Sequence, residues 1–521
     1  MAQLLSELAK KLSDKPALID ERGTTNWIEF NSRVNRLIAG FADAGLQKDD
    51  TIAILSENRR EYYECMAAAT HCGLRYVPVN WHWVPEEVSY VLENSDAQAL
   101  LAGEQFTDLA IETLARADCP NIRLAVSMSE TSREGMRNYD DWIAEYPDHE
   151  PETASLGGPM FYTSGTTGRP KGVVSGSFSG DDKPVALMSL VGQAITGTLG
   201  LPEDGRTLLI GPVYHSAQWA FSYLPLLAGT AVVMRHGFDA AESLRLIDEH
   251  KITNSHLVPT QFVRLLRLDE RIRAEFDGSS LTAVWHGAAP CSFEVKRAMI
   301  DWWGPIIWEY YGSTESAIIS TISSEEWLLH PGSLGKPLPS VEVQVIKSDS
   351  SPAATGEEGQ LYFRSQMGTD FEYHKDPGKT EEAHLEPGVF SVGDIGYMDE
   401  EGYLYMSDRK IDMIISGGVN IYPAEIEGIL VGHKAIADAA VFGIPNEEFG
   451  EEVKAAVELI PGRVPSEELA EEIRTHCREH LAGYKVPRTV DFEESLPRHP
   501  TGKLYKRLLR DRYWEGRTRQ I

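Results

Sequence analysis

The stretch YTSGTTGRPKG, residues 162–172, indicates the fold more clearly than any other part of this 521-residue chain. Its eleven positions hold three glycines, four Ser or Thr hydroxyls, one proline, one arginine and one lysine, and an apolar run at residues 159–161 precedes it. Glycines let backbone N–H groups converge on one point, the hydroxyls add donors, and Lys171 adds a positive charge. The pattern therefore predicts a strand followed by a loop that binds phosphate oxygens.

Two well-known phosphate-binding motifs do not describe this loop. The P-loop needs a glycine followed by lysine and then Ser or Thr, whereas here Lys171 precedes Gly172. The dinucleotide-binding fingerprint needs GxGxxG between a strand and a helix, with an acidic residue downstream, and the chain lacks that arrangement. The loop belongs to another class of phosphate site.

The charge balance of the chain limits its partners. With 79 acidic and 49 basic residues, the formal net charge is −30, which argues against nucleic acid or an anionic membrane surface as a partner. The five cysteines are scattered and show no zinc-ligand spacing. We therefore expect a cytoplasmic protein, in a reducing compartment.

Two uncharged stretches, residues 184–202 and 207–234, approach or exceed the length of a membrane span. Both include polar residues, such as Gln193 in the first and His215 in the second. We expect buried strands and helices of a large core, and no integral membrane span.

The order of apolar patterns predicts an α/β protein with two domains. Up to about residue 405, strand-like runs alternate with helical stretches, which is typical of layered β-sheets flanked by helices. Residues 390–406 resemble a hairpin, and the charged tripeptide at 408–410 follows. We expect a large N-terminal domain at 1–408, a hinge at about 408–411, and a small mobile α+β domain at 409–521.

Four further segments suit the binding of a nucleotide. The segment EYYGSTE (309–315) offers rings for stacking on a base and a carboxylate for a metal, and SVGDIGY (391–397) offers Asp394 to ribose hydroxyls. The segments SDRK (407–410) and HPTGK (499–503) add cations. Each segment alone is a weak signal. Together with residues 162–172, in this order and spacing, they resemble the adenylate-forming (AMP-binding) superfamily across essentially the whole chain.

The resemblance implies an ATP-dependent carboxylate–CoA ligase, that is, an acyl-CoA synthetase. Such an enzyme forms an acyl-adenylate with release of pyrophosphate, then makes a thioester with coenzyme A (CoA) and releases AMP. Its partners are a small-molecule carboxylic acid, ATP, Mg²⁺ and CoA, and a homodimer is left open. One alternative is a relative that loads the thiol of a carrier protein. Another is a catalytically weakened nucleotide-binding homologue.

The resemblance also implies roles for individual residues. The catalytic group would comprise Lys503, Glu315, Lys171 and His215. The residues that would bind ATP or AMP are Thr163, Ser164, Gly165, Thr166, Thr167, Gly168, Lys171, Gly287, Ala288, Ala289, Pro290, Glu309, Tyr310, Tyr311, Gly312, Ser313, Thr314, Asp394, Arg409 and Lys503. The metal ligands would be Thr166 and Glu315, and the CoA tunnel would be formed by Ser416, Gly417 and Gly418.

The acyl pocket is expected at His215, Trp219 and His286. Trp219 resembles the gating tryptophan of some long-chain members, which favours a hydrophobic acid: medium- or long-chain fatty, bulky aryl or steroid side-chain. Packing in the core is the alternative for Trp219, and a hydrogen-bonded core histidine is the alternative for His215. The chain departs from many relatives at Ile411 in the hinge and in residues 175–186, whose role the sequence does not assign.

Overall fold

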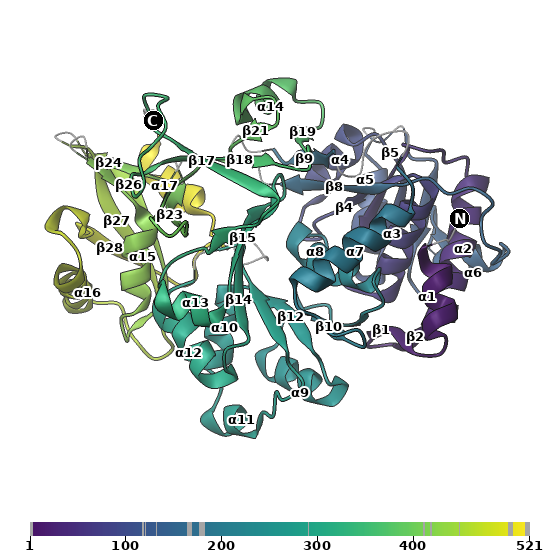
Figure 1. Cartoon of the computed structure of the whole chain (residues 1–521), viewed down its shortest axis with the longest axis horizontal. Helices are drawn as coiled ribbons and strands as arrows, with labels where there is room; N and C mark the ends of the chain where they lie inside the picture. Colours follow the sequence, from purple (N-terminus) through teal and green to yellow (C-terminus); the bar gives the residue numbers. More distant parts are fainter. Residues whose placement is uncertain are drawn as a thin grey trace.

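The structure is a computed structural model that describes residues 4–116, 119, 121–131, 133–163, 169–176, 183–289, 291–409, 412–416, 419–446, 449–498 and 504–515, without the side chains of residues 408, 409 and 420. Its architecture is α/β, with a large N-terminal part built on three sheets and a small C-terminal unit at the opposite end from the N-terminus (Figure 1).

Two large sheets form the centre of the N-terminal part. Within the described residues, one contains, in spatial order, β16 (Lys336–Pro337), β15 (Ala317–Ile322), β14 (Ile307–Ser313), β13 (Ala283–His286), β12 (Asn254–Leu257), β10 (Arg206–Leu209), β11 (Ala231–Met234), β1 (Pro16–Asp20) and β2 (Gly23–Asn26). The other contains β19 (Phe371–Tyr373), β9 (Lys171–Ser175), β8 (Gly158–Thr163), β4 (Arg75–Pro78), β3 (Thr51–Leu55), β5 (Ala97–Ala102), β6 (Leu124–Ser127) and β7 (Arg137–Asn138).

The third sheet and the C-terminal unit are mostly antiparallel. The third sheet contains β20 (His384–Glu386), β21 (Val389–Phe390), β18 (Gly359–Ser365), β22 (Asp394–Met398) and β23 (Leu404–Arg409), with β17 (Val341–Ile346) paired to β18. The C-terminal sheet contains β25 (Val419–Ile421), β24 (Ile414–Ser416), β27 (Gly450–Leu459) and β26 (Ile436–Asn446), with β28 (Thr489–Glu493) paired to β27.

Helices cover these sheets. In chain order they are α1 (Leu4–Leu12), α2 (Trp27–Asp43), α3 (Arg60–Cys72), α4 (Pro85–Asn94), α5 (Thr107–Leu114), α6 (Tyr139–Ala144), α7 (Ala186–Thr198), α8 (Ser216–Leu226), α9 (Ala240–His250), α10 (Pro259–Leu266), α11 (Glu270–Glu275), α12 (Phe293–Trp303), α13 (Ser324–Leu329), α14 (Pro377–Ala383), α15 (Pro423–Val431), α16 (Glu467–His480) and α17 (Lys506–Trp514). Short 3₁₀ turns lie at η1 (Glu104–Phe106) and η2 (Gly483–Lys485).

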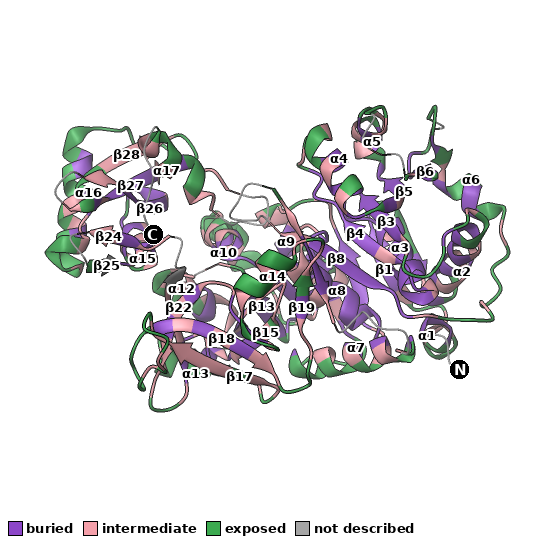
Figure 2. Ribbon diagram, turned by 90° about the horizontal axis from the view of Figure 1, so that it is seen from above, coloured by how far each residue is buried: buried purple, intermediate pink, exposed green. Residues whose placement is uncertain are grey.

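The central strands of both large sheets run parallel; antiparallel strands lie at both edges of the first sheet and at the β19–β9 edge of the second. Parallel strands are buried on both faces, which is why they appear as continuous apolar runs in the sequence. Figure 2 shows this burial in the middle of the N-terminal part. Ligand sites in such sheets lie beyond the carboxyl ends of the strands, and β8, β10, β12, β13 and β14 all end where candidate site residues begin.

The structure confirms several elements expected from the sequence. Residues 394–409 form the antiparallel pair β22–β23, and α16 begins after Ser466, whose hydroxyl accepts the N–H of Leu469 and so caps the helix. The fold class is therefore as expected. The domain boundary at 408/409 stays a prediction.

The expectation that residues 184–202 are buried in the core is wrong. Only Met188 and Gly192 of α7 are buried, and Leu190 is 62% exposed. Figure 2 shows exposed and intermediate residues along much of this helix. The absence of charge therefore does not reflect burial there, whereas residues 207–234 form β10, α8 and β11 in the core as expected. No helix in the described part of the chain is long and apolar enough to cross a membrane.

Candidate functional site

The glycine-rich loop joins two neighbouring antiparallel strands. Thr163 at the end of β8 pairs with Lys171 at the start of β9, so the strands hold both ends of the loop together. The predicted phosphate ligands Ser164, Gly165, Thr166, Thr167 and Gly168 lie outside the described residues. The two described ends show that the loop connects neighbouring strands as a hairpin, and its phosphate role stays a prediction.

Tyr373 connects Lys171 with Glu315. The Lys171 ammonium lies 5.0 Å from the centre of the Tyr373 ring, and the Tyr373 hydroxyl donates a hydrogen bond of 3.0 Å to Oε1 of Glu315. Burial lowers the pKa of Lys171, although the charge of Asp376 opposes the shift. Burial and the charge of Glu315 raise the pKa of Tyr373, so the hydroxyl keeps its proton. A cation and a carboxylate thus meet beside the loop.

No sequence motif pointed to Tyr373. It lies on β19, which pairs with β9 although the two strands are far apart in the chain. Thr314 has a similar unexpected partner, because its hydroxyl lies 2.9 Å from the Ser216 hydroxyl at the start of α8. Both contacts depend on the pairing of distant segments.

Asp394 lies beside two other residues that the resemblance assigns to the nucleotide site. The Tyr311 hydroxyl donates a hydrogen bond of 2.5 Å to Oδ2 of Asp394, and both side chains are buried. In the β22–β23 pair, Asp394 lies directly opposite Arg409. A tyrosine ring and a carboxylate therefore lie side by side, which suits a base and its ribose.

The glycines of the predicted adenine segments leave no room for a side chain. A Cβ on Gly312 would lie 2.0 Å from the carbonyl oxygen of Ala317, and one on Gly287 would lie 2.5 Å from the Tyr310 ring. Ala288 has φ +64°, a conformation uncommon for residues other than glycine. Ala289 follows, whereas Pro290 lies outside the described residues. The backbone between β13 and α12 is thus held in a special conformation beside β14.

The end of β14 turns through a small hydrogen-bonded loop. The Ser313 N–H donates to the hydroxyl of Ser316 at 3.0 Å, and the Ser316 N–H donates back to the Ser313 hydroxyl at 3.1 Å. This turn fixes the direction in which the residues between them leave the strand. Thr314 and Glu315 therefore project from a defined backbone.

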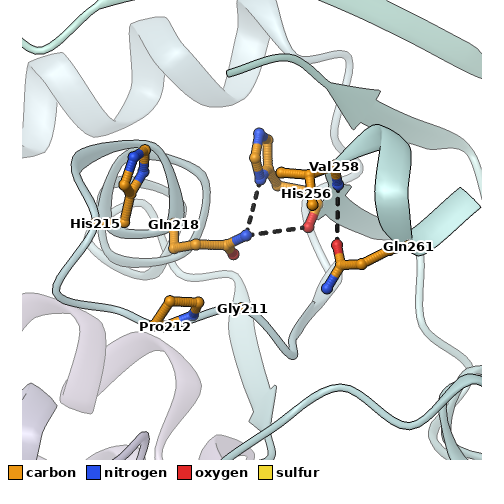
Figure 3. Close-up of a pocket in the computed structure, with 7 residues that line it drawn as sticks. All are labelled: Gly211, Pro212, His215, Gln218, His256, Val258 and Gln261. Carbon is orange, nitrogen blue, oxygen red and sulfur yellow. Dashed lines mark hydrogen bonds between the residues drawn. The ribbon is translucent and has the colours of Figure 1, made fainter. Parts of the chain in front are cut away.

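A hollow lies beside His215. It has about 280 Å³ of empty space, partly open to solvent, and Figure 3 shows the residues that line it: Gly211, Pro212, His215, Gln218, His256, Val258 and Gln261. His215 caps α8, because its Nδ1 accepts the N–H of Ala217 at 3.3 Å. This cap orients the imidazole on the wall of the hollow.

A chain of hydrogen bonds starts at Gln218 in the lining of the hollow and leads to β14. The Gln218 side-chain amide lies 2.9 Å from Nδ1 of His256, and Nε2 of His256 lies 3.1 Å from the Tyr310 hydroxyl. Burial lowers the pKa of His256 to about 3, so the ring is neutral. The amide donates to Nδ1, and the proton on Nε2 is directed to Tyr310. The hollow is thus connected to β14 by an ordered polar chain.

Trp219 packs in the core. It is 5% exposed, its indole N–H donates to the Tyr76 hydroxyl at 2.9 Å, and its ring meets Phe161 edge-on at 5.5 Å. Among the described residues, those that line the hollow include neither Trp219 nor His286. The suggested gating role of Trp219 therefore finds no support in the position of its side chain.

His286 and Glu309 form a buried polar cluster with Lys296. The Lys296 ammonium lies 2.6 Å from Oε2 of Glu309, and Nε2 of His286 lies 3.6 Å from the same oxygen. Lys296 and His286 are fully buried, and the Trp327 ring lies 4.6 Å from the ammonium. Burial, and then the charge of Lys296, lower the pKa of His286 far below its ordinary value. The sequence did not single out Lys296, since a lysine on a helix is usually exposed.

The residues expected from the C-terminal unit are only partly described. Ser416 ends β24 and pairs with Val419, whereas Gly417, Gly418 and Lys503 lie outside the described residues, as does Ile411. Beyond Lys503, Tyr505 acts electrostatically on Tyr214: burial raises the pKa of Tyr214, and Tyr505 raises it further. The chain just after Lys503 therefore lies near the residue that precedes His215.

Hydrogen bonds also join the C-terminal unit to the rest of the protein. Glu358, next to β18, accepts a bond of 2.9 Å from the Tyr422 hydroxyl on Oε2, while its Oε1 accepts one of 2.5 Å from the Ser407 hydroxyl within the N-terminal part. On another side, Arg267 donates to the carbonyl oxygen of Ala437 at 3.2 Å. The bonds from Tyr422 and Arg267 thus join the C-terminal unit to the N-terminal part at two places.

Comparison with known proteins agrees with this geometry. The sequence profile of the family "AMP-binding enzyme" matches residues 5–369, and that of the "AMP-binding enzyme C-terminal domain" matches residues 425–503. A fatty acid–[acyl-carrier-protein] ligase of Streptomyces coeruleorubidus is 31% identical over 100% of this chain and 98% of its own. A 2-succinylbenzoate–CoA ligase of Bacillus licheniformis is 31% identical over 97% of this chain and 98% of its own.

Solved structures show the same fold. The o-succinylbenzoate CoA synthetase of Bacillus subtilis, in complex with its acyl-adenylate intermediate, has a TM-score of 0.81 and 27% identity, with 100% of this chain and 99% of that chain covered. The amide bond synthetase of Marinactinospora thermotolerans has a TM-score of 0.83 and 26% identity, with 98% and 99% covered. The chain therefore belongs to the AMP-binding enzyme family and is an adenylate-forming ligase.

Proposed function

We propose that the protein is an ATP-dependent carboxylate–CoA ligase. The observation that supports this most is the end of β14 and the residues just after it. Over residues 310–315, successive side chains reach the polar wall of the hollow, the buried carboxylate of Asp394 and, through Tyr373, the Lys171 ammonium. One short segment thus touches the places where an acid, a ribose and phosphates would lie.

In the first step, a carboxylate oxygen of the acid would bond to the α-phosphorus of ATP while the bond from that phosphorus to pyrophosphate breaks. Both reactants are anionic, so cations must be placed where charge develops. Lys171 would meet the departing pyrophosphate, and Lys503, assigned by resemblance, would bridge the carboxylate and the α-phosphate. Holding the reacting atoms together contributes about 7–11 kcal/mol to such reactions.

Glu315 fits a magnesium ion. Its carboxylate is half-buried, and the hydrogen bond from the neutral Tyr373 hydroxyl leaves its negative charge in place. Mg²⁺ prefers such oxygen ligands and keeps part of its water shell. Thr166 is the second ligand that the resemblance implies. When bound, the ion would offset the negative charge of the phosphates.

In the second step, the thiolate sulfur of CoA would bond to the acyl carbon while the bond from that carbon to AMP breaks. The thiol would approach along Ser416, Gly417 and Gly418, where glycines leave space for a narrow chain. Rotation about a hinge at 408–411 would exchange this segment for the Lys503 loop. The contact between Glu358 and Tyr422 would have to break during that rotation.

We propose that the acid is hydrophobic and carries a polar substituent. The hollow offers the apolar Val258 and Pro212 beside the amide of Gln218 and the imidazole of His256. A ring-bearing acid with one polar substituent would use both kinds of wall. Within the classes considered, the polar part of this lining favours aryl acids over long-chain fatty acids, whose chains carry no polar group.

One comparison supports the thiol of a carrier protein as an alternative acceptor of the acyl group. A relative 31% identical over the whole chain is named as a ligase that uses an acyl-carrier protein. Its first half-reaction would be the same, and only the thiol would differ. The identity of the thiol therefore has to be tested separately from the formation of the adenylate.

ATP–pyrophosphate exchange with a panel of acids tests the proposal. Aryl, fatty and steroid side-chain acids are each supplied without CoA, and AMP release is then measured with CoA or with a phosphopantetheinylated carrier protein. We expect exchange with one acid class and AMP release with CoA. Glu315→Gln should abolish exchange, whereas the exposed Glu325→Gln should not. Binding of ATP without exchange for any acid would favour the weakened homologue.

A further inference from the structure

The last turn of α16 carries a cluster of side chains that the nucleotide chemistry does not use. Its sequence, HCREH, places His476, Glu479 and His480 at the end of the helix. Cys477 between them is buried in the core of the C-terminal unit, together with Leu469 and Ile473, and this fixes the rotation of the helix. His476 is consequently half-buried at the rim, and Glu479 and His480 are exposed.

These three side chains can converge on one ion. Among the described residues, one ligand atom from each of the three lies within 4.8 Å of the others. The two imidazole rings are 4.7 Å apart, as expected for positions i and i+4 of a helix. A helical His-x-x-Glu-His sequence is also the spacing that one class of zinc metalloproteases uses to hold zinc. The spacing is therefore chemically suitable for a metal.

Hydrogen bonds fix the tautomer of each ring. Nε2 of His476 lies 3.2 Å from the carbonyl oxygen of Ile429 in α15, and Nδ1 of His480 lies 2.9 Å from the carbonyl oxygen of His476. A carbonyl only accepts, so each of these nitrogens must bear the proton. In the neutral rings, the lone pairs then remain on Nδ1 of His476 and Nε2 of His480. This is how metal-binding histidines are usually oriented.

We propose that His476, Glu479 and His480 form a binding site for a divalent transition metal ion of the zinc class. Two imidazole nitrogens and one carboxylate oxygen suit Zn²⁺, Co²⁺ or Ni²⁺, whereas Mg²⁺ and Ca²⁺ prefer ligand sets made of oxygen. Water would complete the coordination. The chain's net charge of −30 favours the approach of any cation.

The neighbouring residues support the site without joining it. The His433 ring lies 5.2 Å from that of His476, its Nδ1 accepts the N–H of Ala435, and its Nε2 lies 3.6 Å from Glu472. Because His476 is bonded to Ile429, a bound ion would be attached to α15 as well as α16. The helix that carries the site, α16, lies at the outer edge of the C-terminal unit, on the side away from α8 (Figure 1).

Titration with Co²⁺ tests the site. The full-length protein is first dialysed against a chelator and then kept in excess Mg²⁺, which occupies oxygen-rich sites including that of the nucleotide. Visible absorption reports nitrogen ligation of Co²⁺, and competition with Zn²⁺ gives the affinity. Three variants are compared with the wild type: His480→Ala, Glu479→Gln and, as a matched control, the exposed histidine variant His149→Ala.

We expect one equivalent of Co²⁺ whose absorption is intensified relative to the aqueous ion and is displaced by Zn²⁺. His480→Ala should weaken binding at least about tenfold, since loss of even an outer partner costs 10–100-fold. Glu479→Gln should weaken it less, and His149→Ala should not change it. Equal affinity in the wild type and His480→Ala, or a spectrum like that of aqueous Co²⁺, would overturn the proposal.

Discussion

The ion pair of Lys296 and Glu309 gives a prediction whose size follows from the structure. Lys296→Met removes a fully buried ammonium that lies 2.6 Å from Glu309 and 4.6 Å from the Trp327 ring. Removing one partner of a buried pair leaves the other charge uncompensated, at a cost of about 3–5 kcal/mol. The unfolding entropy is about 2.1 cal/mol/K per residue, so a cooperative unit of about 400 residues should melt about 4–6 °C lower.

The loss of stability in Lys296→Met should depend on pH, because His286 lies 3.6 Å from the Glu309 carboxylate, whose ion-pair partner has been removed. Its pKa is lowered first by burial and then by the charge of Lys296. Without Lys296 the pKa of His286 rises, and the protonated ring can pair with Glu309. That stabilisation is present at low pH and is lost as pH rises through the new pKa. The variant should therefore be less impaired below the ordinary histidine pKa of about 6.5 than above it.

Thermal unfolding at one fixed scan rate measures these shifts. In the double variant Lys296→Met/Glu309→Gln no charge is stranded, so it should recover most of the lost stability. Lys10→Met, which removes an exposed partner of Glu7, should leave the melting temperature unchanged. A single variant as stable as the wild type, or a double variant no better than the single one, would refute the reasoning.

Four further predictions concern the reaction. Gly312→Ala should reduce exchange by about 10²-fold, because the new Cβ forces the end of β14 to shift. Burial lowers the pKa of Lys171, so Lys171 should lose its charge, and the protein its affinity for ATP, at a lower pH than if this lysine were exposed. Lys171→Arg should flatten this decline when the KM for ATP is measured over a series of pH values. Lys503→Ala should abolish adenylation but spare conversion of preformed acyl-AMP to acyl-CoA, and Gly418→Leu should do the reverse; equal loss of both half-reactions would contradict these roles. Gln218→Leu should change the relative kcat/KM of polar and apolar aryl acids by up to about tenfold, with an unchanged KM for ATP.

The sequence was sufficient for features that are local in the chain. The apolar run at 159–161 and the glycine-rich residues after it predicted a strand followed by a loop, and the structure pairs Thr163 with Lys171 across a hairpin; the phosphate role of the loop stays a prediction. The glycine at 312 was expected in the nucleotide site, and the structure shows that a side chain does not fit there. Turns, strand ends and glycines are determined by neighbouring residues, which is why their patterns are visible in one sequence.

Contacts between distant segments could not be predicted in the same way. Tyr373 reaches Glu315 only because β19 pairs with β9, and Lys296 meets Glu309 only because α12 packs on β14. The position of the Trp219 ring could not be predicted either. Trp219 lies on the helix that His215 caps, but the packing of that helix turns the Trp219 ring into the core.

The measurement that tests the account most directly is the identification of the products. The protein is incubated with ATP, Mg²⁺, CoA and one acid at a time, and the mixture is analysed by mass spectrometry. We predict that an acyl-CoA thioester and AMP appear in equal amounts with at least one hydrophobic acid, and that neither appears when ATP is omitted. Formation of ADP in place of AMP, or an acyl-adenylate that accumulates and is never transferred to CoA, would contradict a carboxylate–CoA ligase.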